Sequence, residues 1–202
     1  MRIQYDEIVQ EFKRILVKKG FSEDDAYESA KLFADNSLDD VYSHGLNRFP
    51  RVVEYIDKGY IDVKAKPEKI DSFGALERWD GNLGMGNLNA KRAMDRAIQL
   101  SRQYGVGVVA LRNTNHWMRG GNYGWQAANA CCIGICWTNT MPNMPAWGAK
   151  DRRIGNNPFI MAVPRSNGQH IVVDTALSQF SYGKIESYRL EDKEMPVVGG
   201  YD

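Results

Sequence analysis

Apolar residues recur at helical spacing through the first sixty residues of the chain. The first run, 5–19, is followed by Gly20, a residue type that commonly ends helices, and its apolar positions are Ile8, Val9, Phe12, Ile15, Leu16 and Val17. Ser22 followed by Asp25 resembles a capping box and begins a second helical pattern that continues to Leu38. A third pattern covers 49–59. We therefore predict a small helical layer in this part of the chain.

Strand-like patterns appear later in the chain. Residues 61–75 are polar and contain a Pro and a Gly, which indicates an extended linker, and 88–104 is again helical. A small-residue segment, 120–130, suits a short helix, and the turn-rich residues 165–169 suit a hairpin. Short apolar runs typical of strands lie at 106–112, 133–139, 159–164 and 170–174.

This order of elements predicts a mixed α/β fold, with a helical region and linker over 1–75 and a mixed-sheet domain over 76–202. The 26 basic and 25 acidic residues nearly cancel, so composition supports neither a nucleic-acid partner nor a membrane surface. No apolar stretch approaches the ~18 residues that a membrane span needs. The first residues also lack the uninterrupted apolar region of a signal peptide. We therefore expect a cytoplasmic protein.

The three cysteines, Cys131, Cys132 and Cys136, lie in one short stretch and do not form a disulfide framework. Their spacing, and that of the histidines, matches no common metal motif, so we predict no metal site and interpret the cysteines as small buried hydrophobic residues. The segment 81–87 reads G-x-x-G-x-G with no clear strand before it. It matches neither the dinucleotide fingerprint nor the phosphate-binding loop, which favours a plain loop before a helix.

Two histidines stand in positions suited to proton transfer or ligand binding. His44 precedes Arg48 by one helical turn, and this pair could protonate a carbonyl oxygen and hold a carboxylate. From these residues alone, a helix-ending His with a surface Arg is the simpler explanation. His116 follows a predicted strand and precedes a glycine-rich run, where ligands commonly approach a sheet. His170 begins an apolar strand, and we interpret it as structural.

Four separated segments, 39–59, 108–128, 133–139 and 145–164, resemble the type-2 malate/L-lactate dehydrogenase family, and they include the runs Ser-His-Gly-Leu-Asn-Arg-Phe-Pro and Asn-His-Trp-Met-Arg-Gly-Gly. The resemblance implies a fold unlike the Rossmann type, a homodimer and an oxidoreductase that acts on CH–OH groups. It implies NADH or NADPH as cofactor, with NADH our first choice. The small-molecule substrate that it favours is a sugar-derived 2-oxo acid.

The same resemblance assigns roles to residues. It implies His44 as the catalytic proton donor, and Ser43, Arg48, Asn115 and His116 as substrate-binding residues. The cofactor-binding stretch would be His170, Ile171, Val172, Val173, Asp174, Thr175 and Ala176. His170 would then border the cofactor while remaining mainly structural.

Two departures from the family leave alternatives open. Relatives are expected to carry Thr where this chain has Asn156, and they continue well beyond Asp202, so the second domain is expected to be incomplete. A malate- or lactate-type dehydrogenase remains a second interpretation. A non-catalytic chain that retains only a dimerisation surface is a third.

Overall fold

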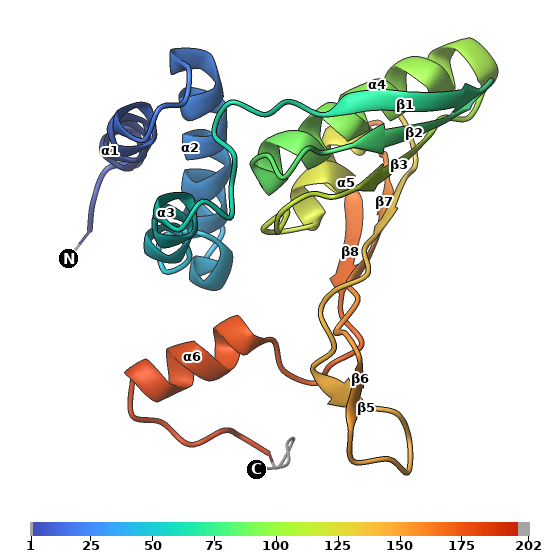
Figure 1. Ribbon diagram of the computed structural model, residues 1–202. Helices are drawn as coiled ribbons and strands as arrows, with labels where there is room; N and C mark the ends of the chain where they lie inside the picture. The colour runs from blue at the N-terminus through green and yellow to red at the C-terminus, as the bar shows by residue number, and fades with distance from the viewer. Residues whose placement is uncertain (1, 198–202) are drawn as a thin grey trace.

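The computed structural model describes residues 2–197. The N-terminal layer contains α1 (Tyr5–Lys18), α2 (Glu23–Leu38), the 3₁₀ turn η1 (Tyr42–His44) and α3 (Phe49–Asp57), as Figure 1 shows in blue and cyan. The Ser22 hydroxyl accepts a hydrogen bond from the Asp25 N–H at 3.2 Å, so the predicted cap is confirmed. The three predicted helices are therefore confirmed, with ends within about two residues of the pattern.

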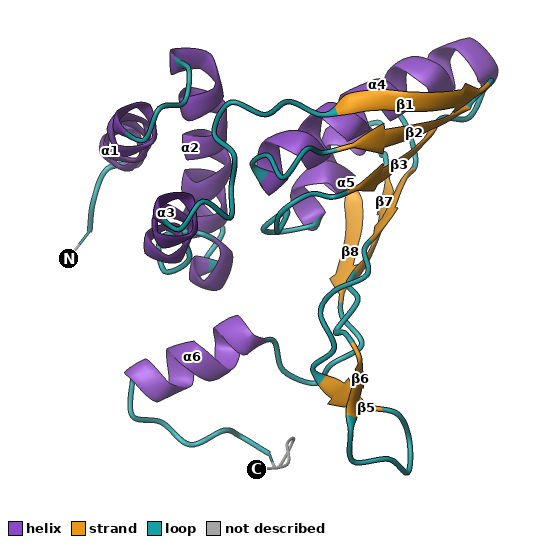
Figure 2. Cartoon of the chain, in the orientation of Figure 1, coloured by secondary structure: helices purple, strands orange, loops and turns teal. Residues whose placement is uncertain are grey.

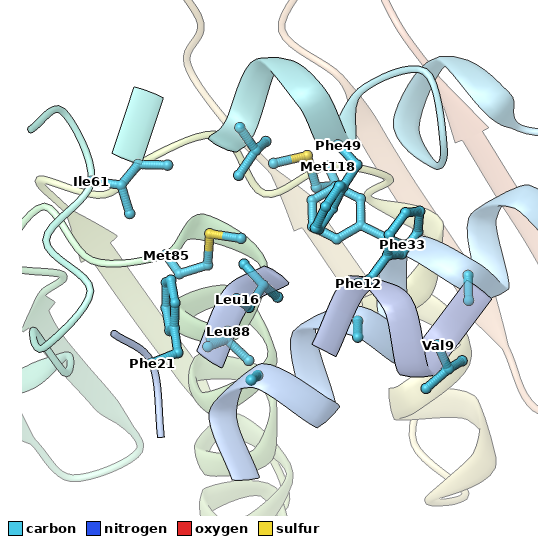
Figure 3. Packing of buried hydrophobic residues seen from close by; sticks show 14 residues of the cluster. Val9, Phe12, Leu16, Phe21, Phe33, Phe49, Ile61, Met85, Leu88 and Met118 are labelled. Carbon is cyan, nitrogen blue, oxygen red and sulfur yellow. The ribbon is translucent and has the colours of Figure 1, made fainter. Parts of the chain in front are cut away.

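Aromatic side chains form the centre of this layer. The ring centroids of Phe12 and Phe49 lie 4.0 Å apart in a stacked pair, and Phe33 meets Phe49 edge-on at 5.2 Å. Figure 3 shows Met118, from a distant part of the sequence, beside Phe49 in the same cluster. Met85 also belongs to this cluster. The core of the N-terminal helices thus extends to Met85, Leu88 and Met118 of the following mixed region.

The next unit combines β1 (Glu68–Phe73), β2 (Leu76–Asp80), α4 (Gly86–Tyr104) and β3 (Val108–Arg112). Strands β1 and β2 pair antiparallel, whereas β2 and β3 are parallel neighbours joined through α4. Figure 2 shows α4 lying along these three strands. The linker prediction is therefore wrong for 68–73, and a strand does precede the glycine segment.

A charged residue explains why this strand pair was missed. On β2 the fully buried side chain is Glu77, which is 1% exposed, while β1 has no buried residue at all. The Arg96 guanidinium donates two hydrogen bonds to the Glu77 carboxylate at 2.7 and 3.0 Å, and the Trp79 indole donates a third at 2.9 Å. Because these donors satisfy a buried carboxylate, the strand does not need the apolar alternation by which strands are recognised.

The second sheet has the order β4 (Gly134–Trp137), β7 (Phe159–Val163), β8 (Ile171–Thr175), and both pairings are antiparallel. The predicted hairpin and strands are thus confirmed. Helix α5 (Gly121–Asn129) packs on one face, where Ile160 and Ala162 are buried. The opposite face exposes large apolar side chains of all three strands, namely Ile135, Trp137, Phe159, Met161, Ile171 and Val173.

Besides η1, β1 and β2, three more short elements were not predicted from the sequence: β5 (Met144–Pro145), β6 (Arg152–Ile154) and α6 (Tyr182–Leu190). The mixed α/β class is confirmed, and the division at residue 75 stays a prediction. No described helix is both long and apolar enough to cross a membrane. The interpretation of the cysteines as buried is wrong for Cys131, which is exposed at the end of α5.

Candidate active site

The 3₁₀ turn η1 and the loop after β3 bring two histidines together. The rings of His44 and His116 lie with their centroids 5.8 Å apart and are tilted by 34°. His44 is the last residue of η1, and His116 lies in the loop that links β3 to α5. Ser43 and Arg48 accompany His44 on the same side, so four of the five residues predicted for catalysis and substrate binding share one neighbourhood.

The glycine segment 81–87 positions the His116 loop. A Cβ atom at Gly86 would collide with the carbonyl oxygens of Asn115 and His116, and one at Gly81 would lie 2.7 Å from Thr114. The segment is a loop leading to the start of α4, as predicted, and its glycines allow close packing of backbone against backbone.

Asn115 supports this loop from inside. Its amide nitrogen lies 2.8 Å from the Leu83 carbonyl oxygen, 3.1 Å from that of Tyr60 and 3.2 Å from that of Gly84. These three acceptors occupy both amide hydrogens, since a side-chain amide has only two. A ligand could therefore use only the Asn115 carbonyl oxygen, and the residue is mainly structural in this arrangement.

His44 is half-buried and hydrogen-bonded through one ring nitrogen. Its Nδ1 lies 2.9 Å from the Ser43 hydroxyl, which leaves Nε2 for a ligand. Burial, with the nearby positive charges of Arg48 and Arg119, lowers the pKa of His44 to about 4. The ring is therefore neutral at pH 7 in the absence of a ligand.

The tautomer of His116 follows from its own contact. Its Nδ1 accepts a hydrogen bond from the Met118 N–H at 2.9 Å, so the neutral ring carries its proton on Nε2. Solvent reaches the side chain, but the protein around it removes enough water to lower its pKa to about 3, with His44 and Arg48 adding to this effect. His116 is thus a neutral hydrogen-bond donor.

Arg48 supplies the positive charge of the group. Its Nε donates a hydrogen bond to the Ser43 carbonyl oxygen at 3.3 Å. Burial lowers the pKa of Arg48, and the positive charge of Arg51 lowers it further. Among residues 2–197 no carboxylate forms an ion pair with Arg48, so its terminal nitrogens can bind an anion. The geometry suits a carboxylate, which takes two parallel hydrogen bonds from a guanidinium.

Arg119 was missed as a candidate from the sequence, although it lies in the run Asn-His-Trp-Met-Arg-Gly-Gly. Its NH1 lies 2.5 Å from an Asp39 carboxylate oxygen, and the guanidinium lies 4.7 Å from the Trp125 ring centre. The charge of Arg119 adds to the lowering of the His44 pKa and opposes the rise in the Asp174 pKa that burial causes. Arg119 is therefore close enough to act both on the histidine pair and on the end of the predicted cofactor strand.

The predicted cofactor stretch, 170–176, is strand β8 and its neighbours. His170 uses both ring nitrogens: Nδ1 accepts from the Arg165 N–H at 3.1 Å, and Nε2 lies 3.0 Å from the Asn129 side-chain oxygen. It thereby fixes the hairpin turn to the end of α5, which agrees with a structural role. The Asp174 carboxylate accepts from the Gly121 N–H at 2.8 Å at the start of α5. Solvent reaches this side chain, but the protein around the carboxylate removes enough water to raise its pKa.

The other residues of this stretch divide between the two faces of the sheet. Val172 is half-buried and would contact a side chain at Gly124 of α5, whereas Ile171, Val173 and Thr175 are exposed. Ala176 follows the strand and is half-buried. The strand therefore offers an exposed surface on which a flat ring could pack.

Asn156, where a relative is expected to have Thr, is hydrogen-bonded to Thr140 and Leu177. Its side-chain oxygen accepts a hydrogen bond from the Thr140 hydroxyl at 2.7 Å, and its carbonyl oxygen accepts from the Leu177 N–H at 2.8 Å. Through these two hydrogen bonds, Asn156 connects the segment after β4 with the end of β8. No group of three His, Cys, Asp or Glu residues suited to a metal occurs among the described residues.

Comparison with known proteins identifies the family of the chain. The malate/L-lactate dehydrogenase family model matches residues 3–202, and the chain belongs to this family. It is 50% identical over all 202 residues to the 2,3-diketo-L-gulonate reductases of Salmonella paratyphi B and Salmonella typhimurium. The aligned region is 60% of the length of those relatives, so the chain spans about three fifths of a full-length reductase of this kind.

Solved structures give the same result for the fold. The malate dehydrogenase of Entamoeba histolytica superposes with a TM-score of 0.93 at 31% identity, covering 96% of this chain and 54% of that one. The sulfolactate dehydrogenase of Methanocaldococcus jannaschii superposes with a TM-score of 0.88 at 34% identity, covering 97% and 57%. The predicted family and the mixed α/β fold are therefore confirmed.

Proposed function

We propose that this chain carries the catalytic and substrate-binding residues of an NAD(P)H-dependent reductase that acts on a sugar-derived 2-oxo acid. The proposed substrate is 2,3-diketo-L-gulonate, and the product is 3-dehydro-L-gulonate. The observation that carries the proposal is the His44–His116 pair beside Arg48. The 50% identity to proteins named 2,3-diketo-L-gulonate reductase supports the choice of substrate.

His44 is the proposed proton donor. Reduction of a carbonyl to an alcohol requires a hydride on carbon and a proton on oxygen, and the free Nε2 of His44 can hold that proton. The His44 ring must first be protonated. The charge of Arg48 lowers the pKa of His44, so a substrate carboxylate that partly neutralises Arg48 would raise the pKa of His44. A positioned acid of this kind contributes roughly 10²–10⁴-fold to the rate.

The other side chains would hold the substrate. Arg48 binds the carboxylate through its terminal nitrogens, and His116 donates from Nε2–H to a substrate oxygen. Ser43 holds His44 through Nδ1, and Asn115 can accept from a substrate hydroxyl through its carbonyl oxygen. The polyhydroxy tail of a sugar acid needs such polar partners, whereas pyruvate and oxaloacetate do not.

A reduced nicotinamide would supply the hydride. The residues that would hold it are those of β8, whose exposed Ile171 and Val173 suit the face of a flat ring. Asp174 already occupies the N–H of Gly121 at the start of α5, so that helix end is not free for a pyrophosphate. NADH is our first choice, and NADPH is the alternative.

We further propose a cytoplasmic homodimer. The apolar surface that β4 and β7 expose beside the proposed cofactor strand, with Ile135, Trp137, Phe159 and Met161, supports association, because an exposed apolar surface of this kind commonly marks an interface. The same face favours the second candidate function, a non-catalytic chain that retains only a dimerisation surface. A malate- or lactate-type dehydrogenase remains the alternative within enzymes and is favoured by the solved structures of that name.

The proposal is tested by following NADH oxidation with 2,3-diketo-L-gulonate, oxaloacetate and pyruvate in parallel. The chain is assayed alone and joined to the remaining two fifths of a relative. Preferential turnover of diketogulonate supports the assignment, and preference for a smaller acid replaces it with the malate- or lactate-type activity. Absence of turnover from both folded proteins, with a dimer in sedimentation, would favour the non-catalytic alternative.

A further inference from the structure

Helix α6 returns from the far end of the chain to the N-terminal layer. It spans Tyr182–Leu190, and Figure 1 shows it on the side of α3 and away from the β1–β2–β3 and β4–β7–β8 sheets. Its contacts with η1 bring it directly to the segment that holds His44. A helix that lies so far from η1 in sequence therefore forms part of the surroundings of the candidate active site.

The contact is made at Gly183, the one buried residue of α6. A Cβ atom at this position would lie 2.8 Å from the Ser43 Cβ and 3.5 Å from both the Ser43 carbonyl oxygen and a terminal nitrogen of Arg48. Only a residue without a side chain allows the helix to approach so closely. The Ser43 carbonyl oxygen is also the acceptor for the Nε of Arg48, so α6 packs against the hydrogen bond that orients this guanidinium.

One ion pair fixes the helix one turn further along. The Arg51 guanidinium of α3 lies 2.8 Å from the Glu186 carboxylate of α6. Glu186 also affects Arg48 itself, because its negative charge opposes the lowering of the Arg48 pKa that burial and Arg51 cause. Both members of the pair are more than a third exposed, so the pair adds a modest energy to a contact that Gly183 makes possible.

We propose that Gly183, Glu186 and Arg51 are positioning residues, which hold α6 against η1 and thereby direct the terminal nitrogens of Arg48 toward the carboxylate of a 2-oxo acid. The carboxylate role rests on the proposed function, whereas the packing of α6 over Arg48 does not. Substrate binding therefore depends on a helix that packs on Ser43 and Arg48.

The first test measures the accessibility of Arg48 without any turnover. Phenylglyoxal modifies accessible guanidinium groups, and mass spectrometry of the fragment containing Arg48 gives the rate for that residue. Glu186→Arg should raise this rate up to about fivefold, the effect of losing one exposed ion pair. The double variant Arg51→Glu with Glu186→Arg restores the pair in reverse and should return the rate close to that of the original chain.

Gly183→Val is the stronger variant, and it should raise the Arg48 rate more than Glu186→Arg does, because the added side chain cannot fit against Ser43. Gly183→Ala separates the lost contact from a weaker helix. Alanine favours helix formation more than glycine does, so any increase in the Arg48 modification rate in this variant must come from the lost contact. Glu11→Arg is the matched control, since it breaks an exposed ion pair of α1 with Arg14 and should leave the Arg48 rate unchanged.

An unchanged Arg48 rate in both Gly183→Val and Glu186→Arg would overturn the proposal. If Gly183→Val does not fold, Glu186→Arg and its charge-reversed double variant decide the question. In a protein that turns over diketogulonate, the same variants should raise KM severalfold with a smaller change in kcat. If the chain has no turnover but phenylglyoxal still modifies Arg48 faster in the variants than in the original chain, the role of α6 is upheld. The absence of turnover then counts only against the proposed function.

Discussion

Glu77 is the residue whose loss of charge should most weaken the β1–β2–β3 sheet, which leads into the candidate site. Glu77 is 1% exposed and receives three hydrogen bonds, two from Arg96 and one from Trp79, while Lys69 lies 3.7 Å away. Strand β2 leads directly into the glycine segment that supports the His116 loop. Glu77→Gln keeps the shape of the side chain but removes its charge.

The magnitude follows from the burial of the two partners. Breaking a fully buried ion pair costs about 3–5 kcal/mol, because one charge is left without compensation. The Arg96 side chain stays 32% exposed, so water partly replaces the lost partner, and we expect about 2–3 kcal/mol. With a urea slope of about 2 kcal/mol per molar, the unfolding midpoint should fall by roughly 1–1.5 M at pH 7.

The difference should also depend on pH in one direction. Hydrogen bonds from Arg96 are the main cause that lowers the pKa of Glu77 from 4.5 to about 2. A carboxylate with a lowered pKa stabilises the folded state fully above its unfolded pKa, and this stabilisation is lost as pH falls toward the folded pKa. The gap between the original chain and Glu77→Gln should therefore be full at pH 7 and shrink from pH 4.5 toward pH 2.

Urea titrations at pH 7, 4 and 3, followed by tryptophan fluorescence, measure both effects. Glu54→Gln serves as the control, because its carboxylate pairs with Lys58 at the surface and its loss should leave the midpoint unchanged. Equal midpoints for the original chain and Glu77→Gln at pH 7 would refute the reasoning. A gap of constant size down to pH 3 would show that the ionised carboxylate is not its source.

Three further predictions address the site and the exposed sheet face. NMR titration of His44 in the unliganded chain should give a midpoint near 4, and Arg48→Gln should raise it by removing a like charge; a midpoint that stays or falls contradicts this account. Gly86→Ala should cost about 1–3 kcal/mol in thermal unfolding and shift the His116 ring signals, whereas Gly148→Ala, with no neighbour within 4 Å, should leave those signals in place. Trp137→Gln should lower the sedimentation coefficient if the exposed apolar surface of β4 and β7 is an interface, and an unchanged dimer would place the interface elsewhere.

The candidate site could be predicted in part from local patterns. The spacing of His44 and Arg48 along the chain put both on one turn, and the structure confirms that they share one neighbourhood. The place of His116 after a strand was also predicted, but its approach to His44 depends on how β3 and η1 are packed. Arg119 and α6 were missed because their partners, Asp39, Ser43 and Arg51, are distant in sequence and leave no local signal.

The sequence alone determined the elements whose stabilisation is local. Helices α1 to α3 have an apolar face and, at Ser22, a side-chain cap, and the hairpin of β7 and β8 has a turn between two apolar runs. Only the tertiary structure decided where charge is buried and which segments meet. Strand β2 formed around Glu77 because Arg96 of α4 neutralises it, and the Asn115 amide became structural because three backbone carbonyls surround it. The spacing of apolar residues shows which side of a helix or strand is buried. It does not show which distant residue will pair with a buried polar group, because that contact forms only when the chain folds.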